Sequence, residues 1–303
     1  SMCLKINQKV KPEWFQACAN GDVKQIEKLM INNATTRDLR KNGTNIYKGF
    51  TGLYYAILNE RSEAIQLLYE SELAYLLDQN QKIVLNGKEL ALPAGTSALQ
   101  LAVYCGRFSA FSQIFSLVSE RDDLAGIVSL TDINGDSLLS TFVMVGTQHA
   151  LNILINSGPR LIEIGLEAMT DLGPLTVSVL YQRLQFLRFF VSCCHIQEFW
   201  AVFSKDLQRN STKIWSAVQK MDLSQKNVFE NLIQQILDHK ILERSVWKVA
   251  ELESPKVVQV KRGDLGIRFE GLGEIGGGDF GEDEFQIQNK KEIQNENENE
   301  NRN

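Results

Sequence analysis

Four stretches of the chain share nearly the same pattern of apolar and polar positions. They begin at Gly49, Gly95, Gly135 and Leu172, and read GFTGLYYAILNE, GTSALQLAVYCG, GDSLLSTFVMVG and LGPLTVSVLYQ. In each stretch, apolar residues recur at the i, i+3 and i+4 spacing of one helical face, and a second apolar helical segment follows. A chain that repeats one helix pair along its length is expected to form a stacked array of such pairs.

The stretch from Gly49 illustrates how one helix pair is encoded. Thr51 is expected to be the N-cap of the first helix, because its hydroxyl can accept a hydrogen bond from a free backbone N–H. Leu53 and Ile57 then lie on one helical face, and a second apolar face follows at residues 64–68. A single short pair cannot bury both faces, so the core is completed only by the next pair.

The repeated pattern resembles the ankyrin repeat, whose consensus reads roughly G-x-T-P-L-H-x-A-x-x-x-G. Aligned on it, the threonine position holds Thr51, Ser97, Ser137 and Gly173, the leucine position holds Leu53, Leu99, Leu139 and Leu175, the histidine position holds Tyr54, Gln100, Ser140 and Thr176, and the closing glycine position holds Glu60, Gly106, Gly146 and Gln182. A half-repeat from Phe15 resembles the family's N-terminal cap, and a weaker unit starts at Asp222. The resemblance covers about residues 12–252 and implies about five to six repeats.

The sequence departs from the family pattern in two respects. No unit keeps the histidine, so we expect the hydroxyl side chains at that position to replace part of the lost hydrogen bonding across the turn. The threonine positions are also 46, 40 and 36 residues apart, more than the usual repeat of about 33 residues. Insertions are therefore expected in the finger loops.

The insertions and the end of the chain complete the predicted fold. Short apolar strands flank Asn86-Gly87, which favours a tight turn, and predict a β-hairpin finger in an insertion at about residues 71–94. Extra helices are expected at about residues 195–222. The fold class is thus all-α, an ankyrin-like solenoid over residues 1–252 with a hairpin finger. We expect an extended strap at 253–270 and a disordered Gly-rich, acidic, Asn-rich tail at 271–303.

Charge and cysteine usage narrow the classes of partner. The net charge of −5 comes from the tail, where Asp279 to Asn303 contains eight acidic and three basic residues; residues 1–278 contain 29 of each. A neutral body without basic clusters argues against nucleic-acid binding. Arg183 and Arg188 interrupt the most apolar window, which argues against a membrane span. Five cysteines without metal-binding spacing indicate a reducing, cytoplasmic setting.

Three motifs have the spacing of known chemistry but lack its context. Gly271 to Gly276 reads G-x-G-x-x-G, but an acidic, glycine-rich segment follows where a dinucleotide site needs a helix. Asp132, Asn134 and Asp136 alternate as in a calcium loop, without the glutamate expected at its twelfth position. Neighbouring residues in Cys193-Cys194-His195 cannot all face one ion. We expect no enzymatic activity, no cofactor and no metal.

The resemblance implies that a partner binds the concave face formed by the fingers and the first helix of each pair. Carried over by position, the partner-binding residues are Tyr47, Lys48, Phe50, Tyr55, Asn59, Leu101, Tyr104, Asp132, Asn134, Thr141, Met144 and Tyr181. In a second interpretation, some of these residues pack between repeats, because stacked arrays bury most helix surface. We expect a monomeric, non-catalytic scaffold for a protein or peptide partner.

Two alternatives for function remain open at this stage. In the first, the acidic tail is a tethered ligand or a self-masking segment that contacts Arg37, Arg40, Lys41 and Lys48. In the second, the protein is an effector or regulatory protein that acts on a host or signalling protein, with an unrecognised activity in residues 195–303. Diverged ankyrin arrays of this kind are similar to those of protists and intracellular bacteria, and an effector would be delivered into a host cell.

Overall fold

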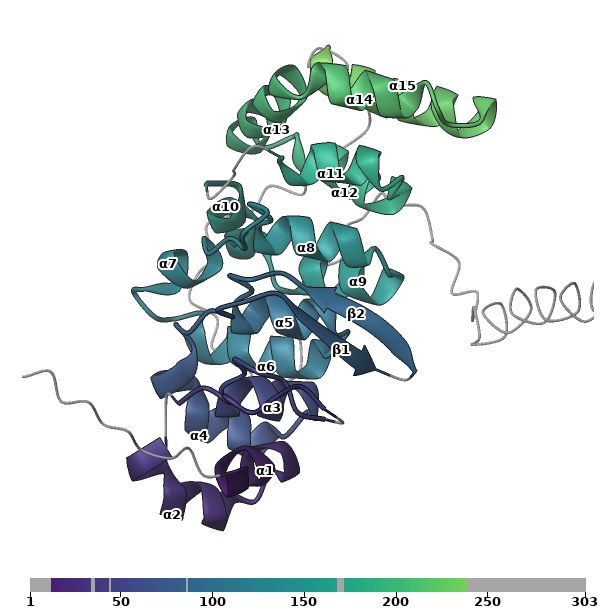
Figure 1. The fold of residues 1–303 in the computed structure, drawn as a ribbon. Helices are drawn as coiled ribbons and strands as arrows, with labels where there is room; N and C mark the ends of the chain where they lie inside the picture. The colour runs from purple at the N-terminus through teal and green to yellow at the C-terminus, as the bar shows by residue number, and fades with distance from the viewer. Residues whose placement is uncertain (1–11, 34–35, 44, 86, 168–171, 239–303) are drawn as a thin grey trace, which may run out of the picture. The chain divides into compact units, whose positions relative to one another are not determined.

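The computed structural model describes residues 12–33, 36–43, 45–85, 87–167 and 172–238. All of them lie in the first of the two units into which the chain divides, Ser1–Ser245 and Val246–Asn303. Over this part the chain forms fifteen helices and one pair of strands (Figure 1). The all-α prediction is confirmed for these residues. The predicted strap at 253–270 and tail at 271–303 lie outside the described residues.

Ten of the helices form five consecutive pairs. The first helices are α1 (Pro12–Asn20), α3 (Gly52–Leu58), α5 (Ala98–Tyr104), α8 (Leu138–Val145) and α11 (Pro174–Leu180); the second helices are α2 (Val23–Asn33), α4 (Ser62–Glu72), α6 (Phe108–Val118), α9 (Gln148–Asn156) and α12 (Leu184–Cys193). Each first helix contacts its own second helix and the first helix of the next pair, and the second helices contact one another in the same order. The apolar faces of each pair are therefore buried against its neighbours.

The remaining helices lie between or after these pairs. They are α7 (Leu124–Val128), α10 (Pro159–Glu167), α13 (Gln197–Arg209), α14 (Ser211–Val218) and α15 (Leu223–Leu237). The helices α13 and α14 fall within residues 195–222, where extra helices were expected, and both contact α11. No helix among the described residues is both long enough and apolar enough to cross a membrane.

The aligned leucines explain why the first helices pack together. Leu53, Leu99, Leu139 and Leu175 are all fully buried. Each of them follows the N-cap by two residues and thus occupies the same place in its helix. Complete burial of one such side chain stabilises a fold by about 1.5–3 kcal/mol, so the repeated leucine is a principal reason for the repeated helix pair.

The first helices of the third and fourth pairs each begin with a serine N-cap. Ser97 accepts a hydrogen bond from the Gln100 N–H, and the Gln100 side chain accepts one from the Ser97 N–H, which completes a capping box. Ser137 accepts a hydrogen bond from the Ser140 N–H in the same way. Both caps satisfy backbone donors that a helix leaves without partners at its start.

The first helices of the second and fifth pairs are capped by carboxylates from other helices. Thr51 is the N-cap of α3, but its buried hydroxyl makes no capping hydrogen bond. Instead, the buried Glu72 carboxylate accepts a hydrogen bond of 2.6 Å from the Leu53 N–H. At α11 the N-cap is Gly173, and Asp206 of α13 accepts hydrogen bonds from the Gly173 and Thr176 N–H groups. A carboxylate from a later helix interacts favourably with the positive end of the helix dipole.

Side chains at the histidine position link consecutive pairs. Tyr54 Oη donates a hydrogen bond to the Thr96 carbonyl oxygen at 2.6 Å, and Gln100 Nε2 donates one to the Asp136 carbonyl at 2.7 Å. Thr96 and Asp136 each directly precede the N-cap of the next first helix. At the same position, Ser140 Oγ lies 3.5 Å from the Leu172 carbonyl oxygen, whereas Thr176 Oγ1 donates to Asp206 of α13. Hydrogen bonds across the turn are thus made by a tyrosine, an amide and one of the two short hydroxyl side chains.

The closing position of each first helix requires a left-handed backbone. Gly106 and Gly146 have φ values of 64° and 66°, and Glu60 and Gln182 at the equivalent positions have φ values of 52° and 55°. Left-handed backbone is unfavourable for residues with a Cβ atom. The same turn conformation therefore forms in two units that have Glu60 or Gln182 in place of glycine.

The hairpin finger is present where the sequence predicts it. Strands β1 (Gln81–Leu85) and β2 (Lys88–Leu92) pair antiparallel, with Leu85 opposite Lys88. Gly87 in the turn has a φ of 77°, the positive value that a two-residue hairpin turn requires. The strands lie between α4 and α5 in the chain (Figure 1).

Candidate binding site

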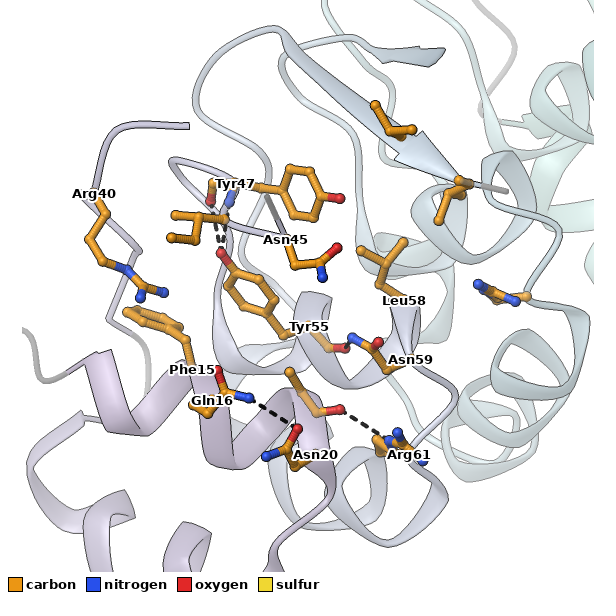
Figure 2. Close-up of a pocket in the computed structure, with 15 residues that line it drawn as sticks. Phe15, Gln16, Asn20, Arg40, Asn45, Tyr47, Tyr55, Leu58, Asn59 and Arg61 are labelled. Atoms are coloured by element: carbon orange, nitrogen blue, oxygen red, sulfur yellow. Dashed lines mark hydrogen bonds between the residues drawn. The ribbon is translucent and has the colours of Figure 1, made fainter. Parts of the chain in front are cut away.

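A cavity of about 330 Å³ opens where the first two helix pairs meet the first finger loop and the hairpin (Figure 2). Helix α1, the loop between α2 and α3, the turn from α3 into α4, the end of β1 and the start of α6 all contribute to it. The lining residues are Phe15, Gln16, Ala19, Asn20, Arg40, Asn45, Ile46, Tyr47, Tyr55, Leu58, Asn59, Arg61, Val84, Leu85 and Arg107. Five segments far apart in the sequence thus form one recessed surface.

Aromatic side chains form one wall of this cavity. The ring of Tyr55 lies 5.5 Å from the ring of Phe15 and 6.2 Å from that of Tyr47, measured between centroids. Tyr55 Oη also accepts a hydrogen bond of 2.8 Å from the Tyr47 N–H. All three side chains are buried. The aromatic wall is therefore fixed by ring packing and by a hydrogen bond from the backbone of the finger loop.

A buried carboxylate behind this wall holds one of the arginines. Asp38 accepts hydrogen bonds from Arg40 Nη2 at 2.6 Å, from Arg40 Nε at 2.9 Å and from Tyr55 Oη at 2.8 Å. Burial alone would raise the pKa of Asp38, but the hydrogen bonds from Arg40 and Tyr55 hold this pKa below its ordinary value. Asp38 is thus ionised near neutral pH and compensates the charge of Arg40.

The other two arginines of the cavity differ in their partners. Arg107 forms an ion pair with Glu60, with 3.2 Å between Nη1 and Oε2. Arg61 donates a hydrogen bond of 3.0 Å from Nε to the Ala19 carbonyl oxygen. Among the described residues, no carboxylate lies within ion-pairing distance of Arg61. Arg61 is also exposed, so its charge faces solvent at the rim of the cavity.

The cavity brings together three of the residues expected to contact a partner, Tyr47, Tyr55 and Asn59. Two of these, Tyr47 and Tyr55, present only a small exposed area, whereas Asn59 is exposed. Lys48 and Asn134 are exposed at the finger loops, and Tyr181 is 51% exposed. Tyr104 and Met144 are half-buried on their first helices.

Four further residues of that set are covered by the protein itself and do not line the cavity. Phe50, Leu101 and Thr141 are fully buried, and Asp132 is nearly so. Leu101 and Thr141 lie in the layer of first helices, where each helix contacts the next. These side chains pack within the protein in this structure, as the second interpretation of the sequence expects, and do not form part of its surface.

The Asp132 carboxylate is used by its own loop. Asp132 Oδ1 accepts hydrogen bonds from the Asn134 N–H at 2.8 Å and the Asp136 N–H at 3.0 Å, and Oδ2 accepts one from Tyr104 Oη. Burial and the nearby Asp132 charge raise the pKa of Asp136 to about 6. The described residues contain no group of three or more His, Cys, Asp or Glu side chains arranged to hold a metal ion.

The cysteine pair is also part of the packing. Cys193 and Cys194 are buried at the end of α12, and His195 Nδ1 lies 2.7 Å from the Ser192 carbonyl oxygen. Burial raises the pKa of the Cys193 thiol to about 12. A thiol with so high a pKa is protonated near neutral pH and is a weak nucleophile.

The sequence contained a signal for the arginines that was not recognised. Arg61, Arg107 and Arg183 each directly follow the closing position of a first helix. Each also reaches back to the preceding pair: Arg61 contacts Ala19, Arg107 contacts Glu60, and Arg183 Nη2 donates to the Met144 carbonyl oxygen at 3.0 Å. A cation at these helix ends interacts favourably with the negative end of the helix dipole. A repeated arginine after the closing position is thus a feature of this chain.

Comparison with known proteins adds little to this description. No protein-family model and no curated protein matches the chain. Among solved structures, the complex of a predatory endopeptidase from Bdellovibrio bacteriovorus with an immunity protein is similar at 14% sequence identity and a TM-score of 0.25, over 53% of this chain and 93% of the matched chain. A likeness with so low a TM-score carries no argument about fold or function.

Proposed function

We propose that this chain is a diverged ankyrin-like solenoid that serves as a non-catalytic scaffold, and that it binds a protein or peptide partner through the surface formed by its finger loops and first helices. The serial contacts between first helices support the solenoid. So do the equivalent hydrogen bonds from Tyr54 and Gln100 into the following turn. A stack of this kind presents its loops and first helices as one extended surface.

The observation that carries the functional proposal is the cavity of Figure 2. It lies beside the first helices α1 and α3 and the loop between α2 and α3, and it combines a fixed aromatic wall with exposed polar groups at Asn59 and Arg61. A preformed recess with aromatic and arginine side chains is typical of the positions that dominate the binding energy of protein interfaces. Fixed side chains lose little conformational entropy when a partner binds.

Further residues extend the proposed surface along the later pairs. Tyr104, Met144 and Tyr181 are at least partly exposed at or directly after the ends of α5, α8 and α11. Tyrosine and methionine are enriched in interfaces because they supply large contact area and adaptable shape. We therefore place the partner across several first helices, with one end at the cavity.

An affinity purification from native lysate tests this proposal with variants of exposed residues. The variant Asn59→Lys/Tyr181→Ala changes the proposed surface, and Gln66→Lys introduces a similar charge on the exposed side of α4 as a control. Both variants should fold as the wild type does, because all three side chains are exposed. The partner should be retained by the control and lost from the double variant. Retention of every bound protein by the double variant would show that the surface is wrongly assigned.

A further inference from the structure

We infer that the cavity between Arg61, Tyr55 and Val84 binds an acidic segment of the partner protein, with an aspartate or glutamate side chain at Arg61 and an apolar side chain beside it. This inference rests on the proposed scaffold function and assigns the chemistry of the segment that the scaffold takes. We call such a stretch of the partner an acidic-apolar segment.

The charge of the cavity favours a carboxylate. Its fifteen lining residues include Arg40, Arg61 and Arg107 and no aspartate or glutamate. Asp38 and Glu60 compensate Arg40 and Arg107 from behind the wall and from the rim. The charge of Arg61 therefore remains uncompensated within the described residues, although residues 1–278 as a whole carry equal numbers of acidic and basic residues.

Arg61 is also held in position for such a ligand. Its Nε donates to the Ala19 carbonyl oxygen, and its aliphatic stem packs against Gly21, where an added Cβ atom would lie 3.2 Å from Cδ of Arg61. The hydrogen bond uses one of the five N–H donors of the guanidinium group. The terminal nitrogens can therefore form the paired hydrogen bonds that arginine makes with carboxylates, at a reduced cost in side-chain entropy.

The rest of the cavity suits the backbone and the apolar part of the segment. Asn45 and Asn59 are exposed beside the aromatic wall (Figure 2), and their amide groups can both donate to and accept from peptide groups. Val84, near the end of β1, is 59% exposed, and Leu58 and Leu85 also line the cavity. An exposed valine beside a positively charged recess favours a ligand in which an apolar residue neighbours an acidic one.

Selection of displayed random peptides on the full chain tests the inference directly. The enriched peptides should contain aspartate or glutamate next to an apolar residue. Fluorescence anisotropy should then show that Arg61→Gln weakens their binding by about tenfold or more. The variant Arg160→Gln removes the same charge from an exposed position on α10 and should leave binding unchanged. Arg61→Lys keeps the charge and should lose less affinity than Arg61→Gln.

A second pair of variants separates the effect of charge on peptide binding from any effect of a substitution on folding. Val84→Glu and Val84→Lys change the same exposed side chain at the rim of the cavity. The glutamate should weaken binding of the acidic peptides and the lysine should strengthen it, and both effects should decrease at high salt.

The results of the peptide selection and of the variants can reject the acidic-apolar segment without rejecting the scaffold function. Peptides without acidic residues that bind equally to wild type and Arg61→Gln, but not to Tyr181→Ala, would overturn the acidic-apolar segment and leave the scaffold in place. Equal effects of Val84→Glu and Val84→Lys would also overturn it. If no peptide is enriched, the inference fails, and the affinity purification with Asn59→Lys/Tyr181→Ala still decides the scaffold function.

Discussion

Gln100 in α5 donates a hydrogen bond of 2.7 Å from Nε2 to the backbone carbonyl oxygen of Asp136, the residue directly before the N-cap of α8. The same side chain accepts a hydrogen bond from the Ser97 N–H through Oε1. Gln100 is fully buried, so both bonds form away from solvent. One amide thus joins the start of its own helix to the start of the next first helix.

Replacement of Gln100 tests the importance of this link for stability. Gln100→Leu keeps the approximate volume but leaves the Asp136 carbonyl and the Ser97 N–H without these partners. We expect it to lower the free energy of unfolding by about 2 kcal/mol. Gln100→His keeps a side chain that can form a hydrogen bond across the turn, so it should cost less. Urea denaturation followed by tryptophan fluorescence measures both variants, and equal stability of wild type and Gln100→Leu would contradict the role of the link.

The left-handed residue Gln182 offers a stabilising substitution. Its φ of 55° is unfavourable for a residue with a Cβ atom but not for glycine. We expect Gln182→Gly to raise the free energy of unfolding by about 0.5–1 kcal/mol, because relief of strain exceeds the entropy cost of glycine in the unfolded chain. Gln182→Ala keeps the strain and serves as the matched control. A glycine variant no more stable than the alanine variant would contradict the assigned turn.

The buried Asp38 should make stability depend on acid pH. Its pKa is held below the ordinary value in the folded protein, so it contributes stability that is fully present above the unfolded pKa of about 3.9 and is lost as the pH falls through the folded pKa. Asp38→Asn weakens the hydrogen bonds from Arg40 and Tyr55 and should cost about 2 kcal/mol near pH 7. Denaturation at a series of pH values should show a smaller cost at the acid end; a constant cost would exclude this linkage.

Asp136 should lower the stability of the folded protein as the pH rises towards neutral, opposite to the effect of Asp38. Its pKa is raised to about 6 by burial and by the charge of Asp132, so the folded state is favoured below the unfolded pKa of about 3.9 and loses this advantage as the pH rises to about 6. After allowance for solvent screening at this partly exposed group, Asp136→Asn should gain up to about 1 kcal/mol near pH 7 and little near pH 4. Asp122→Asn, at an exposed position, is the control. A gain of the same size at both pH values would contradict the raised pKa.

Local sequence patterns predicted the helix pairs and the hairpin because short-range physics determines them. The leucine of each unit and the Asn86-Gly87 turn act through neighbours in the chain, and the structure places Leu99 in the core and pairs Leu85 with Lys88. The equivalence of Glu60 with Gly106 also follows from alignment of the units, and both residues have positive φ.

Contacts between distant segments could not be read in this way. The sequence predicts a cap from Thr51, whereas the Leu53 N–H is satisfied by Glu72, which lies on the second helix of the pair. Asp206 accepts a hydrogen bond from the Gly173 N–H. The two residues are 33 positions apart in the chain, so no short-range sequence pattern predicts this contact. The cavity likewise combines Ala19, Arg61 and Val84 from three separate segments. The sequence indicates Arg61 only through its position in the unit, directly after the closing position, which Arg107 and Arg183 share in their units.

Site-specific photo-crosslinking in native lysate tests whether a partner protein binds at the first helices beside the cavity. A photoreactive amino acid at Asn59, beside the cavity, and another at Gln66, on the exposed side of α4, probe the two layers of helices in the same molecule. Position 59 should crosslink to a specific protein through a segment containing aspartate or glutamate, and position 66 should not crosslink to that protein. Crosslinks to the partner from position 66 alone would show that the partner binds the other layer of helices.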